Sequence, residues 1–305
     1  VVELRRRGRQ RRGALCGSLV RDHLVERFLH AARVAARRHD ELGAALQQVG
    51  FAGVQAAGLR LLVVGASSGI GHAVAVNAAR RGARVAVAAR RLDLLTEVAD
   101  AIGGFAFELD VVDPAAINTV VAQAADALGG LDAVVFTSTV VPFSYVADTD
   151  RATWLHAFAV NTVGANNVLR AALPHLSDQG VVLITSNHDV GNPRAGAAAF
   201  NASKAALDEI LRAWRGEHPE LALIRVGVGP TAGTEILRGA DRELLAQLFR
   251  SWVEHGQLPA QMSELDDVAN TLVSLVTMAH AHPTVVPEIV QLAPRIRKKE
   301  HSSAE

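Results

Sequence analysis

Between residues 59 and 292, short apolar runs alternate with longer stretches in which apolar residues recur every three or four positions. Near-continuous runs of Val, Leu, Ile and Ala are typical of parallel strands buried on both faces. We expect strands at 61–64, 85–89, 105–109, 133–136, 181–185, 221–226 and 285–290. We expect helices at about 69–81, 92–102, 113–128, 152–175, 198–217 and 264–279. This alternation predicts an α/β domain with a doubly wound parallel sheet and helices on both faces.

Three other segments fall outside this alternation. Residues 1–58 are rich in arginine and have a helical pattern, which we interpret as a solvated arm or as residues upstream of the native start. A nucleic-acid or membrane-surface tether is the alternative for this extension. Residues 234–256 form a further helical stretch, either a lid over a pocket or a plain surface helix pair. Residues 293–305 are charged and serine-rich and predict a loose tail.

Composition narrows the class of protein. Hydrophobic residues make up 50% of the 305-residue chain, enough for the core of an enzyme-sized domain. The chain contains no uninterrupted run of about 18 apolar residues, so we expect no membrane-spanning helix. The single cysteine, Cys16, excludes an intramolecular disulfide and a multi-cysteine zinc site, and we expect a cytoplasmic protein without a metal. The net charge is +0, so we expect no general nucleic-acid surface on the domain.

The first predicted strand runs directly into a glycine-rich turn that opens the next helix. This order of strand, turn and helix is typical of a dinucleotide-binding site, although a plain tight turn is the alternative. The glycines let the backbone approach a pyrophosphate, and the helix start offers free N–H groups and a positive dipole. The residues that we expect to bind phosphate are Gly65, Ser67, Ser68, Gly69, Ile70 and Gly71.

The end of the second predicted strand indicates which dinucleotide is bound. An NAD site has an acid there, which holds the ribose hydroxyls, but this chain has Ala89. Arg90 and Arg91 follow and offer guanidinium groups to a 2′-phosphate. The sequence therefore favours NADP, and the alternative is a surface pair at a helix start.

Lysine is nearly absent from the chain. Of the 31 Lys and Arg residues, only Lys204, Lys298 and Lys299 are lysines, and the last two lie in the C-terminal tail. A single interior lysine in such a chain indicates a retained function for Lys204. A surface lysine on a helix is the alternative.

Taken in order, these motifs resemble the short-chain dehydrogenase/reductase family over about residues 59–292. Besides the glycine spacing, Asp110-Val111 after the third strand matches the family's adenine contact. Asn161, Ser186 and Lys204 match three of its four catalytic positions. The resemblance implies a Rossmann-like fold of about seven strands. It also implies hydride transfer between NADP(H) and a carbonyl or alcohol.

The resemblance implies a role for each of these residues. Ser186 would polarise the carbonyl, Asn161 would hold a relay water, and Lys204 would hold the nicotinamide ribose. Pro230 and Thr234, after the sixth strand, would contact the cofactor. Family relatives form homodimers or homotetramers through the helices that correspond to 152–175 and 198–217.

The chain departs from the family at the position that carries the chemistry. The family's tyrosine, which donates the proton, is replaced by Phe200, which has no hydroxyl. Glycine is also missing from 136–139, and Pro230 is followed by Thr231 where the family has Pro-Gly. The last strand lacks its usual Gly-Gly at 291–294.

Three substitutes for the tyrosine are open: Tyr145, His188, and water delivered through Ser186. We therefore expect an impaired or atypical oxidoreductase that acts on a small, hydrophobic substrate. The alternative is a non-catalytic NADP(H)-binding sensor or partner subunit. The sequence does not name the substrate.

Overall fold

The computed structural model describes residues 55–259 and 261–295. The expected N-terminal arm, with its alternative of a nucleic-acid tether, lies almost entirely outside the described residues. Most of the expected C-terminal tail also lies outside them. The predicted domain between residues 59 and 292 is described apart from residue 260.

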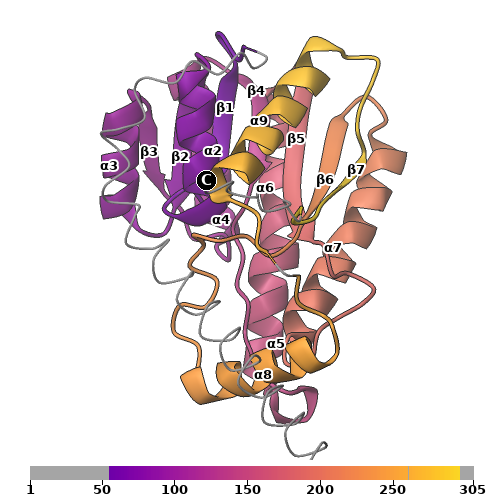
Figure 1. Ribbon diagram of the computed structural model, residues 1–305. Helices are drawn as coiled ribbons and strands as arrows, with labels where there is room; N and C mark the ends of the chain where they lie inside the picture. Colours follow the sequence, from indigo (N-terminus) through magenta and orange to yellow (C-terminus); the bar gives the residue numbers. More distant parts are fainter. Residues whose placement is uncertain (1–54, 260, 296–305) are drawn as a thin grey trace, which may run out of the picture.

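The described residues form one seven-stranded sheet, in which every neighbouring pair of strands is parallel. The strands are β1 (Arg60–Val64), β2 (Arg84–Ala89), β3 (Phe105–Glu108), β4 (Leu131–Phe136), β5 (Leu176–Asn187), β6 (Ala222–Val228) and β7 (Ile289–Leu292). Their order is β3-β2-β1-β4-β5-β6-β7, so the chain winds outward from β1 to one edge and from β4 to the other. This confirms the predicted doubly wound, Rossmann-like sheet, and its switch point lies between β1 and β4 (Figure 1).

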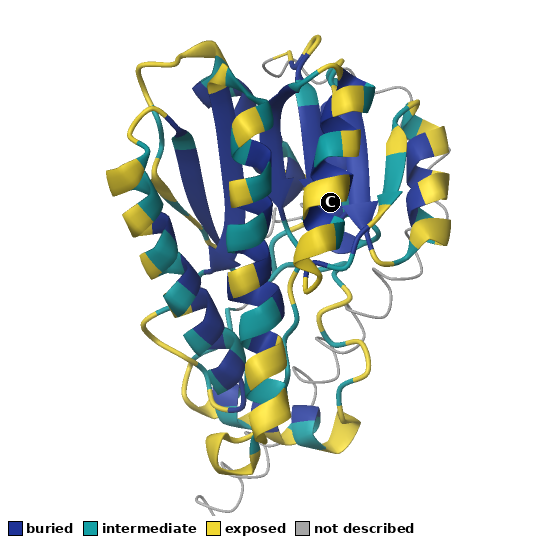
Figure 2. Cartoon of the chain, turned by 180° about the vertical axis from the view of Figure 1, so that it is seen from behind, coloured by how far each residue is buried: buried dark blue, intermediate teal, exposed yellow. Residues whose placement is uncertain are grey.

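Helices cover both faces of the sheet (Figure 2). The helices are α2 (Gly69–Arg80), α3 (Leu92–Ile102), α4 (Pro114–Leu128), α5 (Arg151–Phe158), α6 (Ala165–Ala172), α7 (Ala198–Glu217), α8 (Arg242–Glu254) and α9 (Leu265–Ala281). One core lies between the sheet and α2, α3 and α9, and the other between the sheet and α4, α6 and α7. Because both faces are covered, β1, β2 and β4 are almost entirely buried, as their apolar sequences predict.

The structure corrects three of the predicted elements. The long helix predicted at 152–175 is divided by a π-helical segment, η3 (Ala159–Gly164), between α5 and α6. The strand predicted at 285–290 begins only at Ile289, because Pro287 has no N–H for the ladder. Of the helical stretch predicted at 234–256, only α8 is helical, and Asp241 caps it by accepting hydrogen bonds from two backbone N–H groups.

A partly buried ion pair joins β1 to β4 at the amino ends of the strands, away from the predicted site. Arg60 Nη2 lies 2.6 Å from Asp132 Oδ1, and the backbone N and Nε of Arg60 donate to Oδ2 at 3.0 and 2.9 Å. Burial raises the pKa of Asp132, but these hydrogen bonds outweigh it and hold the pKa at about 2. The pair therefore fixes the register of the two strands at the switch point.

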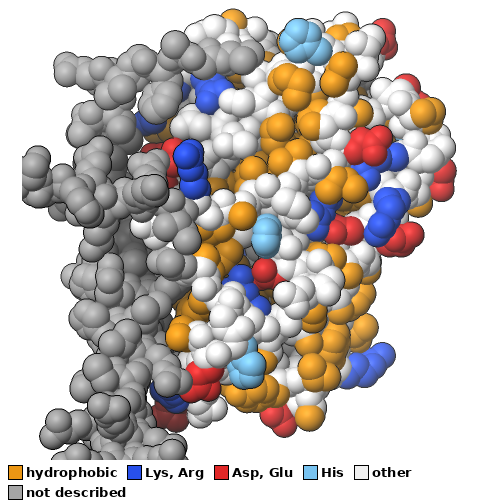
Figure 3. All heavy atoms as spheres, turned by 45° about the vertical axis from the view of Figure 1, so that its right-hand side comes forward, with side chains coloured by type: hydrophobic (Ala, Val, Ile, Leu, Met, Phe, Trp, Pro, Cys, Tyr) orange, Lys and Arg blue, Asp and Glu red, His pale blue; other side chains and the backbone are white. Residues whose placement is uncertain are grey.

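Within the described residues, no helix is long and apolar enough to cross a membrane. On the face shown in Figure 3, acidic and basic side chains lie next to one another among patches of hydrophobic side chains.

Candidate cofactor and substrate site

The glycine-rich turn lies at the carboxyl end of β1, beside the segment that follows β4. A Cβ atom on Gly65 would overlap the backbone of Ser138, and one on Gly71 would overlap the carbonyl of Gly65. Both positions therefore require glycine, and Gly65 also has a left-handed φ of 93°. The close packing brings the first turn of α2 against the loop after β4, where its N–H groups face the sheet's carboxyl edge.

Arg91 lies over this turn and contacts its serines. Arg91 Nη2 donates to Ser67 Oγ at 3.0 Å and to Ser68 Oγ at 2.8 Å, and Nε donates to Ser67 Oγ at 3.2 Å. Arg90 is exposed, whereas Arg91 donates hydrogen bonds to the serines of the turn. Of the two predicted arginines, the structure therefore brings Arg91 to the predicted phosphate site.

A carboxylate already lies among these donors. Glu235, from the segment between β6 and α8, places Oε2 2.9 Å from Arg91 Nη2 and is hydrogen-bonded to Ser68. Burial raises the pKa of Glu235, but the hydrogen bonds from Arg91 and Ser68 outweigh it and lower the pKa. An acidic group held at the start of α2 shows that the site accommodates an anion, which fits the phosphates of a dinucleotide.

Asp110 and Val111, the predicted adenine contact, follow β3 at the same carboxyl edge of the sheet. Asp110 follows β3 and accepts a hydrogen bond from Val112 N at 3.2 Å. Val111 is buried, and its carbonyl would lie 2.8 Å from a Cβ on Gly164. Gly164 therefore lets the π-helical segment pack against this turn, which connects the predicted adenine contact to the segment that carries Asn161.

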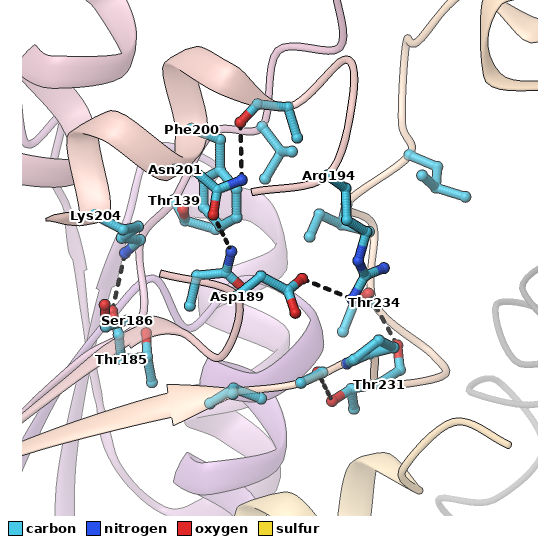
Figure 4. A pocket seen from close by; sticks show the side chains of 18 of the residues that line it. Thr139, Thr185, Ser186, Asp189, Arg194, Phe200, Asn201, Lys204, Thr231 and Thr234 are labelled. Atoms are coloured by element: carbon cyan, nitrogen blue, oxygen red, sulfur yellow. Dashed lines mark hydrogen bonds and ion pairs between the residues drawn. The ribbon is translucent and has the colours of Figure 1, made fainter. Parts of the chain in front are cut away.

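A pocket of about 190 Å³ opens next to the glycine turn. Ile70, Pro230 and Thr234 line it on the cofactor side, and Phe200 and Lys204 line it from α7. Figure 4 shows Phe200, Asn201 and Lys204 together on α7, with Thr185 and Ser186 close to Lys204. The predicted cofactor residues that line this cavity are Ile70, Lys204, Pro230 and Thr234, and they lie there together with Ser186 and Phe200. The other predicted cofactor residues and Asn161 do not line it.

Lys204 is the buried cation of this pocket. Its side chain is 2% exposed, and Nζ donates to the backbone carbonyl of Thr185 at 2.9 Å. Burial lowers the pKa of Lys204 to about 7, against a smaller opposing effect of Asp208. The structure therefore excludes the alternative of a surface lysine.

The side chain of Asn161 joins the loop after β4 to α7 through hydrogen bonds. Its Oδ1 accepts from Val140 N at 2.8 Å and from Thr139 Oγ1 at 3.0 Å. Its Nδ2 donates to Val140 O and to Ser203 Oγ, both at 2.9 Å. The π-helical turn orients this fully buried amide, and such turns occur often at functional sites.

The hydroxyl of Ser186 is hydrogen-bonded to an acidic residue of α7. Ser186 Oγ donates to Asp208 Oδ1 at 2.6 Å, and Asp208 forms an ion pair with the buried Arg225 at 2.6 Å. Ser186 therefore belongs to a buried polar cluster, which the sequence did not indicate.

Sequence reasoning missed Asn187, the next residue along β5. Asn187 Nδ2 donates to Asn201 Oδ1 at 2.8 Å, and Asn201 Nδ2 donates to Ala197 O at 3.0 Å. Both asparagines line the pocket next to Phe200. Ser186 and Asn187 both line the pocket and both contact α7, Ser186 through Asp208 and Asn187 through Asn201. The sequence therefore contains no signal that separates the two residues.

A partly buried ion pair in the substrate part of the pocket was also missed. Arg194 Nη2 lies 2.6 Å from Asp189 Oδ2, and the guanidinium stacks on Trp252 at 5.5 Å from the ring centroid. Trp252 Nε1 in turn donates to Ala195 O at 2.9 Å. These contacts bind α8 to the segment before α7 and form the polar end of an otherwise apolar wall.

A family model described as "short chain dehydrogenase" matches residues 60–243. The chain belongs to the short-chain dehydrogenase family. Glycine betaine reductase ATRR from Emericella nidulans is 32% identical over 221 residues, which cover 70% of this chain and 17% of that protein. Versicolorin reductase stcU from the same organism is 35% identical over 160 residues, which cover 50% of this chain and 60% of that protein. The chain thus spans less than two thirds of either relative.

Solved structures of short-chain dehydrogenases have the same fold. A short-chain dehydrogenase/reductase from Mycobacterium marinum superposes with a TM-score of 0.69 at 26% identity, covering 78% of this chain and 95% of that one. A short-chain dehydrogenase from Burkholderia cenocepacia, solved in complex with NADP, superposes with a TM-score of 0.66 at 24% identity. It covers 78% of this chain and 97% of that one.

Among the described residues, neither side-chain substitute for the family's tyrosine lines the pocket of this short-chain dehydrogenase. Tyr145 is 40% exposed in the loop after β4. The His188 side chain is 37% exposed, and its Nδ1 lies 3.4 Å from Asp189. Lys204 is therefore the group in the pocket whose pKa lies near neutrality.

Proposed function

We propose that this chain is an NADP(H)-dependent oxidoreductase that acts slowly on a carbonyl or alcohol substrate. The observation that carries the proposal is the contact of Arg91 with Ser67 and Ser68 at the start of α2. A guanidinium beside two hydroxyls suits a ribose 2′-phosphate, and NADP carries this group whereas NAD does not.

We assign the other cofactor contacts to residues at the same carboxyl edge of the sheet. The first N–H groups of α2, at Gly69 and Ile70, would hold the pyrophosphate. Asp110 and Val111 would hold the adenine, and Lys204 the nicotinamide ribose. Pro230 and Thr234 would cover the nicotinamide end. When bound, the nicotinamide supplies or accepts the hydride.

We assign the polarisation of the substrate carbonyl to Asn187 rather than to Ser186. Asn201 takes one N–H of the Asn187 amide, which leaves the second for a ligand in the pocket. The hydroxyl of Ser186 is held by Asp208. Asn161, whose amide is fully used, positions α7 against the loop after β4.

Phe200 explains why the reaction is slow. Its ring cannot exchange a proton, and general acid–base catalysis contributes about 10²- to 10⁴-fold to a rate. Lys204, one turn further along α7, has a pKa of about 7 and provides the remaining titratable group. The substrate is largely apolar, because apolar side chains such as Val141, Phe143 and Leu237 line the pocket.

A second function is favoured by the same Phe200. Without a proton donor at this position, the chain would bind NADP(H) as a sensor or as the partner subunit of an active relative. This function predicts NADPH binding without NADPH consumption on any carbonyl.

We also propose that the chain forms a homodimer or homotetramer. Leu155 on α5 and Val163 in η3 are 52% and 51% exposed, on the helices through which family relatives associate. Light scattering of the full chain distinguishes these assemblies from a monomer.

The substitution Phe200→Tyr tests the proposed activity. It restores a hydroxyl next to Lys204, so we expect NADPH-dependent turnover on a panel of carbonyls to rise about tenfold or more. The affinity for NADPH should change little, because the ring lies on the substrate side. Turnover by the wild-type chain contradicts the sensor function, and no gain with Phe200→Tyr contradicts the catalytic one.

A further inference from the structure

The segment 231–241, between β6 and α8, reaches across to the glycine turn. Its base is fixed, because Ala232 N donates to Ser263 O and Ser263 N donates to Pro230 O, both at 2.9 Å. Gly233 and Gly239, with left-handed φ values of 79° and 76°, bracket the five residues between them. These two glycines let residues 234–238, which we call the strap, change direction without strain.

The strap closes on the cofactor side of the pocket. The Cα of Thr234 would lie 3.7 Å from a Cβ on Gly69, so the strap is in contact with the start of α2. Ile236 and Leu237 line the pocket, and Leu237 also packs on the apolar cluster of α8. The position of the strap therefore affects both the phosphate site and the pocket.

Glu235 fastens the strap through charge. Besides Arg91 and Ser68, its carboxylate lies 3.4 Å from Arg238 Nη1 within the strap. The α2 helix has no acidic residue in its first turn, so Glu235 supplies from a distant segment the anion that this helix start favours. The carboxylate thus occupies the donors that a ribose 2′-phosphate would use.

We propose that Glu235 is a cofactor-discriminating residue, which a 2′-phosphate displaces from Arg91 and which a nucleotide without this phosphate leaves in place. This inference rests on the proposed NADP(H) site. A phosphate dianion matches Arg91 better than one carboxylate does, because it carries more charge and more acceptor oxygens. When Glu235 separates from Arg91, it keeps Arg238 as an ion-pair partner, so its carboxylate is not left unpaired.

The contact has a defined effect on affinity. Every 2′-phosphate must first break the Glu235–Arg91 pair, and the carboxylate then repels it. Because the side chains of Arg91 and Glu235 are 29% and 43% exposed, the effect is moderate. Removing the carboxylate charge should tighten NADPH binding about three- to tenfold and leave NADH binding within about twofold.

The test is a calorimetric titration of the full chain with NADPH and with NADH, comparing the wild type with Glu235→Gln. Glu243→Gln is the matched control, because Glu243 is an exposed acid on the adjoining α8. We expect the control to leave both affinities unchanged. The fragments 2′,5′-ADP and 5′-AMP repeat the comparison without the nicotinamide, which excludes an effect that arises only in the pocket.

A double-mutant cycle shows whether Arg91 carries the effect. In an Arg91→Gln background, Glu235→Gln should no longer tighten NADPH binding. Unchanged or weaker NADPH binding by Glu235→Gln overturns the inference. A selective loss of NADH binding also overturns it, because Glu235 would then hold ribose hydroxyls. If neither nucleotide binds the wild type or the variant, the proposed function itself is contradicted and the inference falls with it.

Discussion

The two halves of the sheet differ in how closely their ligand-facing residues follow the family resemblance. At β1 to β3, the glycine turn, Arg91 and Asp110 lie together at the carboxyl edge. At β4 to β7, Phe200 lies where the family resemblance places a tyrosine, and Thr139 is bonded to Asn161. We propose that the nucleotide half binds the cofactor phosphates and that proton transfer depends on the other half. Lys204 has a part in both proposed roles, because it would hold the nicotinamide ribose and its pKa is about 7.

A substitution in the glycine turn of the nucleotide half should have the largest effect on NADPH affinity and on stability. Gly71→Ala places a Cβ atom against the Gly65 carbonyl, so the turn must open. We expect NADPH affinity to fall about 100-fold and the free energy of unfolding to fall by about 2–3 kcal/mol. Calorimetry and urea unfolding measure the two effects.

Gly216→Ala is the control for this substitution, because a Cβ there meets nothing within 4 Å on helix α7. It should leave NADPH affinity unchanged and should not destabilise the protein. Equal NADPH affinities for Gly71→Ala and the wild type would show that the turn is not the phosphate site.

The substrate half is probed through its buried lysine. The pKa of Lys204 is about 7 in the folded chain, below the ordinary lysine value of 10.5, so unfolding takes up a proton between these two pH values. Burial of the ammonium thus costs stability below pH 7, and this cost disappears as the pH rises toward 10. Lys204→Met should stabilise the chain by about 1–2 kcal/mol more at pH 6 than at pH 9, measured by urea unfolding.

Arg212→Met, at an exposed cation on the same helix, serves as the comparison and should give the same change in stability at both pH values. If Lys204→Met also gave equal changes at pH 6 and pH 9, the ammonium would not be desolvated in the folded chain.

The smallest effects should separate the two neighbours on β5. Asn187→Ala removes the amide that we assign to the carbonyl, and turnover should fall about tenfold. Ser186→Ala removes a bond to Asp208, so the chain should lose about 1 kcal/mol of stability and keep its turnover within about threefold. The reverse pattern in steady-state kinetics would return the carbonyl contact to Ser186.

The sequence predicted the sheet well because its strands are buried on both faces and read as continuous apolar runs. It predicted the position of the glycine turn after the first strand, because the local spacing of the glycines specifies it. It also singled out Lys204, because this is the one lysine outside the C-terminal tail. It could not choose between Ser186 and Asn187, since only the folded chain shows that the hydroxyl of Ser186 is bonded to Asp208 and the amide of Asn187 to Asn201. The contact of Glu235 with Arg91 was missed because only the folded chain brings these two segments together. The π-helical turn at Asn161 has no distinct hydrophobic period.

The central claim is that the nucleotide half binds NADP(H) although Phe200 offers no hydroxyl in the pocket. A calorimetric titration of the full wild-type chain with NADPH, and with NADH as the control, tests it without any assumption about the substrate. The account predicts micromolar binding of NADPH and binding of NADH that is at least about tenfold weaker. Tighter binding of NADH would contradict the role of Arg91, and binding of neither nucleotide would contradict the account as a whole.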